Sequence, residues 1–157
     1  MAFTNKSIWI KYAHIKFFLE QYNFWAPKET GGILMGYKLE HKIYVTDIVG
    51  PGPKAIHEKE SFTPDNDYHE NEIAQIYERS GRIHTYIGEW HTHPENESYL
   101  SGRDKKTLKN ISTNPLCRLP QPVMIILGTS PFEFKSWLYN PKAAISFQEL
   151  KINICSA

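Results

Sequence analysis

The chain has 157 residues, of which 41% are hydrophobic and 22% charged, a composition typical of one globular domain and not of a disordered chain. Its 18 Lys and Arg residues nearly balance its 17 Asp and Glu residues, and this net charge of +1 argues against a broad nucleic-acid surface. Cys117 and Cys155 lie far apart, and no apolar run approaches the ~20 residues of a membrane span. We therefore expect a reduced, cytoplasmic protein that binds neither nucleic acid nor a membrane.

Hydrophobic periodicity predicts helices that alternate with strands. The expected elements, in chain order, are a strand over 7–10, a helix over 11–22, strands over 30–37 and 42–49, a helix over 65–79, a strand over 84–93, a helix over 101–111, and strands over 123–127, 132–139 and 144–154. Residues 54–60 are polar and predict no element. This order indicates a mixed α/β architecture, but the pattern leaves the order of strands in the sheet open.

The segment Gly-Glu-Trp-His-Thr-His-Pro over 88–94 carries the strongest chemical signal. Alternate side chains of a strand share a face, so His91 and His93 point the same way, with Cα atoms about 6.6 Å apart. Trp90 then faces the opposite side, where it can pack in the core. Pro94 cannot continue an internal ladder, so the chain leaves the sheet beside the second histidine. This arrangement lets two imidazoles converge on one metal ion.

Ser101 and Asp104 open the helix predicted over 101–111, with Ser101 as its N-cap. Asp104 lies eleven positions past His93, far enough for its carboxylate to fold back over the two imidazoles. Two histidines and one carboxylate suit a catalytic Zn²⁺ ion that keeps a fourth position for water. The Ser101 hydroxyl, one helical turn away, is suited to hydrogen-bond a tetrahedral oxyanion.

Glu29 stands immediately before the glycine-containing strand predicted over 30–37. A carboxylate at this place can take the proton of an attacking water and pass it to a leaving amine. Glu29 is thus the candidate general acid/base of a hydrolase.

Each of these features also has an ordinary interpretation. Two histidines on one strand face are most often unrelated to a metal. Ser101 and Asp104 match a helix capping box, and a cap can coexist with a ligand because it holds the turn that presents Asp104. Glu29 alone would more often be a solvated loop carboxylate. The combination of all these features in one order is what favours a zinc hydrolase.

The remaining histidines and aromatic residues are weaker candidates. His69 is expected on a helix surface or in packing. His84 lies seven residues before His91, which puts it on the other face of a regular strand, so we do not expect it to be a ligand. Four aromatic residues at the end of the first helix are expected in the core: Phe17, Phe18, Phe24 and Trp25.

The ordered set of motifs resembles the JAMM (JAB/MPN) zinc metalloproteases. Glu-Thr-Gly-Gly-Ile-Leu-Met-Gly over 29–36, His-Thr-His-Pro over 91–94 and Ser-x-x-Asp over 101–104 carry the resemblance. It implies the following roles: one Zn²⁺ per chain held by His91, His93 and Asp104, Glu29 as general acid/base, and Ser101 as stabiliser of the oxyanion.

The resemblance also implies a fold. It is a cytidine-deaminase-like mixed α/β sheet flanked by helices, in a single JAB/MPN metalloprotease domain over 1–157. The loop over 95–100 departs from the family, because many relatives carry a proline just before the serine. This departure concerns the conformation of the loop and not the ligands.

Within the family, the chain looks like bacterial JAB peptidases of ubiquitin-like conjugation operons, including antiphage systems that make cyclic oligonucleotides. The implied function is a zinc-dependent isopeptidase or peptidase. It would hydrolyse the amide bond after the C-terminus of a ubiquitin-like modifier, or of a conjugated nucleotidyltransferase, through a zinc-activated water. The implied partners are that modifier or conjugate and the activating and conjugating enzymes of the same operon.

Three alternatives stay open. A peptidase could instead process a small sulfur-carrier protein with the same metal chemistry. A non-catalytic MPN-type scaffold would bind partners only, although such modules usually lack the ligands that this sequence retains. A zinc nucleobase deaminase is suggested by the implied fold alone, because its His-x-Glu and Pro-Cys-x-x-Cys signature is absent.

Overall fold

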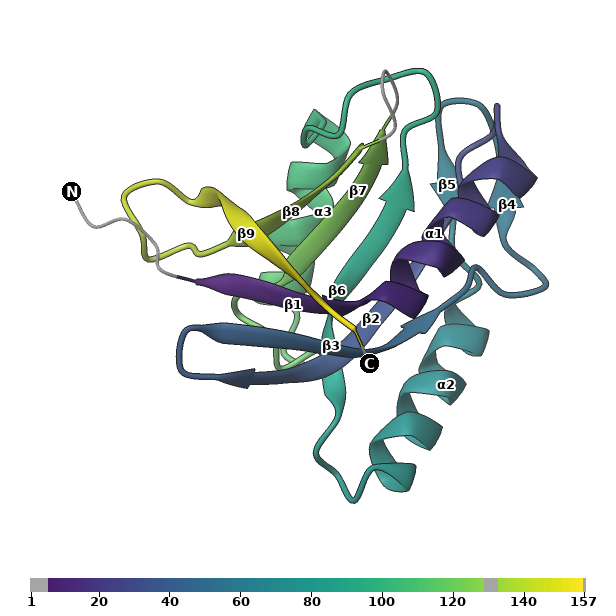
Figure 1. The fold of residues 1–157 in the computed structure, drawn as a ribbon. Helices are drawn as coiled ribbons and strands as arrows, with labels where there is room; N and C mark the ends of the chain where they lie inside the picture. Colours follow the sequence, from purple (N-terminus) through teal and green to yellow (C-terminus); the bar gives the residue numbers. More distant parts are fainter. Residues whose placement is uncertain (1–5, 129–132, 157) are drawn as a thin grey trace.

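A computed structural model describes residues 6–128 and 133–156 (Figure 1). The elements, in chain order, are β1 (Ser7–Lys11), α1 (Tyr12–Trp25), β2 (Gly31–Leu39), β3 (Lys42–Val49), β4 (Ile56–His57), β5 (Phe62–Thr63), α2 (Asn66–Arg79), β6 (Thr85–Thr92), α3 (Gly102–Thr113), β7 (Val123–Gly128), β8 (Glu133–Tyr139) and β9 (Phe147–Cys155). None of these helices has the length and apolar character that crossing a membrane requires.

The main sheet is mixed and has the strand order β1-β3-β2-β6-β7-β8-β9. Antiparallel β2 and parallel β7 flank β6, the strand that carries the His-x-His motif. A parallel pairing of β1 with β9, in register from Ser7↔Lys151 to Lys11↔Cys155, closes the sheet into a barrel. The predicted mixed α/β fold is confirmed. Its closure was not predicted, because the pairing joins the two ends of the chain.

The core lies on both faces of β7, whose six residues are all buried. On one face, Ile125 packs with Trp90 of β6 and Phe18 of α1. On the other face, Met124 and Leu108 of α3 belong to one cluster. The apolar run of β7 therefore anchors α1 and α3 on opposite sides of the sheet (Figure 1). This packing fixes where α3 begins relative to the end of β6.

The helix ends follow local signals in the sequence. α1 ends at Trp25, just before Ala26 and Pro27, as expected where a proline restricts the preceding residue. Asp65 caps α2 by accepting a hydrogen bond from the Tyr68 N–H at 3.2 Å. α3 begins after Ser101, which forms the predicted capping box.

The structure corrects several details of the sequence prediction. The polar stretch after β3 contains β4 and β5, which pair as a two-stranded sheet and were not predicted. Phe24 is 75% exposed and is not part of the core. The last strand, predicted from residue 144, begins at Phe147, and the predicted start of β8 at Phe132 lies outside the described residues.

Candidate metal and catalytic site

The end of β6 presents both histidines of the motif. His91 is the second-last residue of this strand, and the predicted core position of Trp90 on the other face is confirmed, with 1% exposure. His93 follows the strand and still donates its backbone N–H to Leu127 O at 2.7 Å. The chain then leaves the sheet at Pro94. Strand alternation therefore carries both imidazoles to one side of the sheet.

Asp104 reaches the histidines from the first turn of α3. Its carboxylate accepts the Ser101 N–H at 2.8 Å, and its own N–H donates to Ser101 Oγ at 3.1 Å. Asp104 is only 5% exposed. The capping box thus holds the carboxylate rigidly at the start of the helix, above the end of β6.

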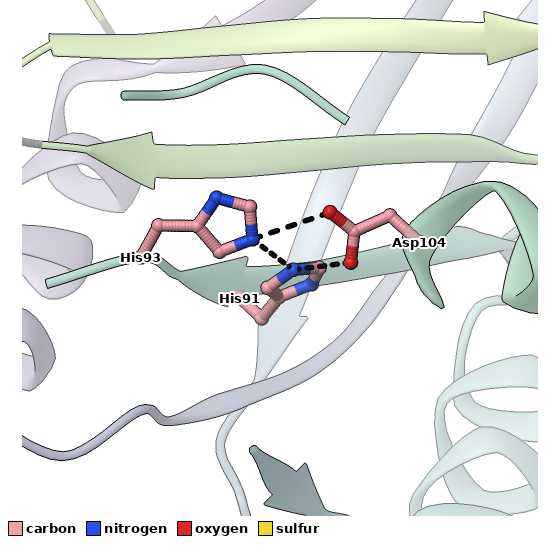
Figure 2. Close-up of side chains that lie close together, drawn as sticks. All are labelled: His91, His93 and Asp104. Carbon is pink, nitrogen blue, oxygen red and sulfur yellow. Dashed lines mark hydrogen bonds and ion pairs between the residues drawn. The ribbon is translucent and has the colours of Figure 1, made fainter. Parts of the chain in front are cut away.

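The three side chains meet at one point (Figure 2). His91 Nε2 lies 2.8 Å from Asp104 Oδ1, and His93 Nε2 lies 3.2 Å from Asp104 Oδ2. The two Nε2 atoms are 3.0 Å apart. One ligand atom from each residue falls within 4.8 Å of the others, so the group could hold a metal ion. Two ring nitrogens and a carboxylate are a donor set that fits Zn²⁺.

The hydrogen bonds around His93 favour a metal-binding tautomer. His93 Nδ1 lies 3.1 Å from the carbonyl oxygen of Glu97, an acceptor that requires a proton on Nδ1. In a neutral ring, Nε2 then carries the lone pair that faces Asp104. This is the tautomer that could ligate a cation through Nε2.

Electrostatics at the site keep the carboxylate charged. Burial alone would raise the pKa of Asp104, but the hydrogen bonds with His91 and His93 hold that pKa well below its usual range. Burial is the largest single effect on the pKa of His93 and lowers it, but the hydrogen bond with Asp104, the charge of that carboxylate and the hydrogen bond with Glu97 together raise the pKa. The structure therefore places a charged carboxylate directly beside the ring nitrogens of His91 and His93.

The register between β2 and β6 brings Glu29 to the same place. Gly31 is paired with His91, and Thr92 donates its backbone N–H to Thr30 O at 2.9 Å. Glu29 precedes Thr30 and His93 follows Thr92, so this bond brings Glu29 close to the histidines. Burial raises the pKa of the half-buried Glu29 carboxyl, while the nearby His91 and His93 lower it.

The β4–β5 hairpin holds the backbone of Glu29 in place. Glu29 donates its N–H to Glu58 O at 2.7 Å, and His57 Nδ1 lies 3.0 Å from Glu29 O. The His57 ring stacks on Trp25, with 3.3 Å between ring centroids. Sequence reasoning missed His57, since two-residue strands are too short to show a period. The only sequence signal for this hairpin was a polar turn with apolar residues on either side.

Gly31 is required by the close approach of β6. A Cβ at this position would lie 2.6 Å from Trp90 O and 2.8 Å from His91 Cβ. Any larger residue would push β2 away from the strand that carries the histidines. Gly31, two residues after Glu29, therefore lets β2 lie close to the strand that carries the histidines.

The loop between β6 and α3 is anchored in spite of its departure from the family pattern. Ser98 is completely buried and donates from Oγ to Glu133 Oε1 at 2.8 Å. Its carbonyl oxygen accepts the indole N–H of Trp137 at 3.1 Å. These contacts tie the loop to β8.

A cavity of about 700 Å³ opens beside the three converging side chains. Glu29, His91 and Asp104 all line it, and it extends between α2 and α3 along β6. The general-base candidate and two of the three possible ligands therefore face one space that a substrate could enter.

The sequence of the chain matches a known protein family. The family described as prokaryotic homologs of the JAB domain matches residues 13–140. The chain belongs to this family. The predicted JAB/JAMM relationship is thereby confirmed.

Individual relatives of this JAB protein agree with the family. A "Probable metalloprotease y4qB" of Sinorhizobium fredii is 39% identical over 135 residues, covering 85% of this chain and 80% of that protein. A "CD-NTase/cGAS isopeptidase" of Vibrio cholerae is 34% identical over 77 residues, 49% of each chain. Its Escherichia coli counterpart is 28% identical over 106 residues, 66% of this chain and 64% of that protein. The predicted enzyme class, a JAMM-type metallopeptidase, is confirmed.

A solved structure supports the fold of the JAB protein. The solution structure of protein DSY2949 from Desulfitobacterium hafniense superposes with a TM-score of 0.72 over 96% of this chain and 94% of that chain. The two share 17% sequence identity, so the likeness concerns the fold alone.

The structure also places Ser101, His69 and His84 of the JAB protein, for which the sequence predicted roles. Ser101 is exposed next to Asp104, and because its oxygen accepts the Asp104 N–H, its O–H proton can donate elsewhere. His69 is buried with Nε2 2.8 Å from Gly50 O, which confirms the packing role. His84 lies 3.5 Å from Asp47 and outside the converging group.

Proposed function

We propose that this JAB protein is a cytoplasmic zinc-dependent isopeptidase or peptidase and that residues 1–157 form one JAB/MPN metalloprotease domain. Its reaction would be hydrolysis of the amide bond after the C-terminus of a ubiquitin-like modifier or of a conjugated nucleotidyltransferase. The observation that carries this proposal is the convergence of His91, His93 and Asp104 on one point, beside a cavity that Glu29 also lines.

The metal in this proposal is one Zn²⁺ per chain, held by His91 Nε2, His93 Nε2 and the Asp104 carboxylate. Bound there, zinc would acidify a water molecule and polarise the scissile carbonyl. The Glu97 carbonyl fixes the tautomer of His93, and the Ser101 N–H orients the carboxylate of Asp104. Such hydrogen bonds from outside the ligand set are the usual support of a metal site.

The protein side chains carry the protons of the proposed reaction. Glu29 accepts a proton from the attacking water as the C–O bond forms, and the Ser101 hydroxyl donates a hydrogen bond to the oxyanion. Glu29 then gives the same proton to the amine as the C–N bond breaks. The products are a carboxylic acid end and a free amine, and Glu29 returns to its starting state.

The proposed substrate class is based on the names of the relatives and on the cavity at the site. Two of the relatives are named as isopeptidases of CD-NTase/cGAS, and this name motivates the nucleotidyltransferase conjugate. The activating and conjugating enzymes that would form such a conjugate are the expected partners. A protein tail could enter the cavity in extended form and lay its last carbonyl beside His91 and Asp104.

A deconjugation assay tests this function. Zinc-loaded wild type and Glu29→Gln would be incubated with conjugates made by the activating and conjugating enzymes proposed as its partners. We expect wild type to release the free modifier with an intact C-terminus, seen by gel and intact mass, and Glu29→Gln to leave the conjugates whole. Equal release by both proteins, or no release by fully zinc-loaded wild type, would contradict the proposal.

A further inference from the structure

Glu89 is a carboxylate in the same cavity that the proposed reaction does not use. It lies on β6 two residues before His91, so both side chains point to the same face of the sheet. Glu89 is half-buried and lines the cavity together with His91. Because Glu89 and His91 are two positions apart on one strand, their Cα atoms are about 6.6 Å apart.

A bulge in β6 orients Glu89 through Tyr86. Leu34 of β2 pairs with Gly88 and Met35 with Tyr86, which leaves Ile87 as an extra residue in β6. The bulge brings residues three apart onto one face, and the Tyr86 hydroxyl donates to Glu89 Oε2 at 3.2 Å. This bond holds one carboxylate oxygen of Glu89, and both residues line the cavity.

The walls of the cavity near Glu89 are apolar. Met124 of β7 is paired with Glu89 and lines the cavity, and Ile111 of α3 and Leu116, which is 89% exposed, line the same cavity. A cavity lined by apolar side chains and a carboxylate matches a long side chain with an aliphatic stem and a cationic end.

The charge of the cavity points to the same ligand class. Four carboxylates line it, and Arg103 is the one Lys or Arg among the described lining residues. Arg103 donates to Glu60 O at 3.0 Å, toward the β4–β5 hairpin. The ion pairs formed by the described residues do not include Glu89. Zinc would neutralise charge at Asp104 but leaves the carboxylate of Glu89 for another cation.

We propose that Glu89 and the apolar walls beside it form a specificity pocket for a lysine or arginine side chain of the substrate tail. This inference rests on the proposed function, which places an extended tail along β6. An extended chain advances about 3.3 Å per residue, so the basic side chain would stand about two residues from the scissile bond. Tyr86 is the positioning residue that holds the carboxylate.

Peptide binding tests the pocket without hydrolysis. The probes are fluorescein-labelled octapeptides of Gly, Ser and Thr that carry one Arg, one citrulline or one Glu at each position in turn. Binding to zinc-loaded protein in a Glu29→Gln background would be followed by fluorescence anisotropy. We expect Arg to bind about tenfold tighter than its neutral isostere citrulline at one position, the scale of a hydrogen-bonded charge pair. Equal or undetectable binding of the Arg and citrulline peptides would overturn the proposal.

Added substitutions assign the preference to Glu89. Glu89→Gln should bring the Arg-to-citrulline ratio close to one, whereas Glu70→Gln, an exposed carboxylate on the same cavity, should leave it unchanged. If circular dichroism shows that Glu89→Gln does not fold, substitutions at the exposed position 116 test the pocket instead. Leu116→Lys places an ammonium group at the pocket and should lower the Arg-to-citrulline ratio at least threefold. Leu116→Met is the control and should leave that ratio unchanged. An unchanged ratio in Leu116→Lys would reject the pocket.

The outcomes separate this proposal from the catalytic one. A normal deconjugation assay with an Arg-to-citrulline ratio near one rejects the pocket alone. A retained ratio with no release of modifier by zinc-loaded wild type rejects the peptidase reaction and keeps the pocket.

Discussion

Thr92 Oγ1 accepts a hydrogen bond from the backbone N–H of Thr30 at 2.9 Å, and both residues are completely buried. This bond joins the end of β6 to the residue just before β2. Glu29 lies on one side of it, and His91 and His93 lie on the other. A single buried hydroxyl thus sets the spacing between the candidate base and the candidate ligands.

Removing this hydroxyl should destabilise the protein. Thr92→Val has nearly the same shape but leaves the Thr30 N–H buried without an acceptor, which costs about 1–3 kcal/mol. Urea unfolding followed by circular dichroism would measure the free energy of unfolding. Thr113→Val, an exposed hydroxyl that donates to Lys109 O on α3, is the matched control and should change it by less than about 0.5 kcal/mol. Equal stability of both variants would refute the role of Thr92.

Metal content should depend on the converging group. Purified protein should hold about one zinc ion per chain. His91→Ala removes a ligand, and Asp104→Asn removes the negative charge while keeping an oxygen for the Ser101 N–H, so both should lose the metal. Mass spectrometric metal analysis gives the content directly. His84→Ala, which changes a histidine outside the group, should stay fully loaded. Full zinc in both ligand variants would rule out this site.

Glu29 should be needed for hydrolysis and not for metal binding. Glu29→Gln keeps the size of the side chain but cannot accept the proton, so we expect kcat to fall by about 10²–10⁴-fold with zinc content unchanged. Glu58→Gln alters an exposed side chain whose residue contacts Glu29 only through its backbone, and it should keep the wild-type rate. Undiminished cleavage by Glu29→Gln would remove Glu29 from the mechanism.

The two roles of Ser101 can be separated by a pair of substitutions. Ser101→Ala loses both the cap and the hydroxyl and should cost about 1 kcal/mol of stability. Ser101→Gly loses the hydroxyl but costs only a few tenths of a kcal/mol at an N-cap. If the hydroxyl stabilises the oxyanion, both variants should lose about 10²–10³-fold in kcat. A rate that tracks thermal stability instead would show that Ser101 serves only as the cap.

Local patterns account for much of what the sequence predicted. Periodicity and capping residues placed α2 and α3 closely, because Asp65 and Ser101 act within their own helical turns. Strand alternation placed His91 and His93 on one face and Trp90 on the other, since a period of two is a property of the backbone itself. The resemblance in motif order then identified the family from residues that are far apart in the chain.

Only the tertiary structure decided the relationships between distant segments. The register of β2 against β6 brings Glu29 close to His91 and His93, and no local pattern encodes a register. The support of Glu29 by His57 and the bulge that turns Tyr86 toward Glu89 both depend on neighbouring strands. The sequence alone determined which chemistry is available, because residue type and spacing are local. The packing of α3 on β7 and the strand pairing decided which of those groups meet.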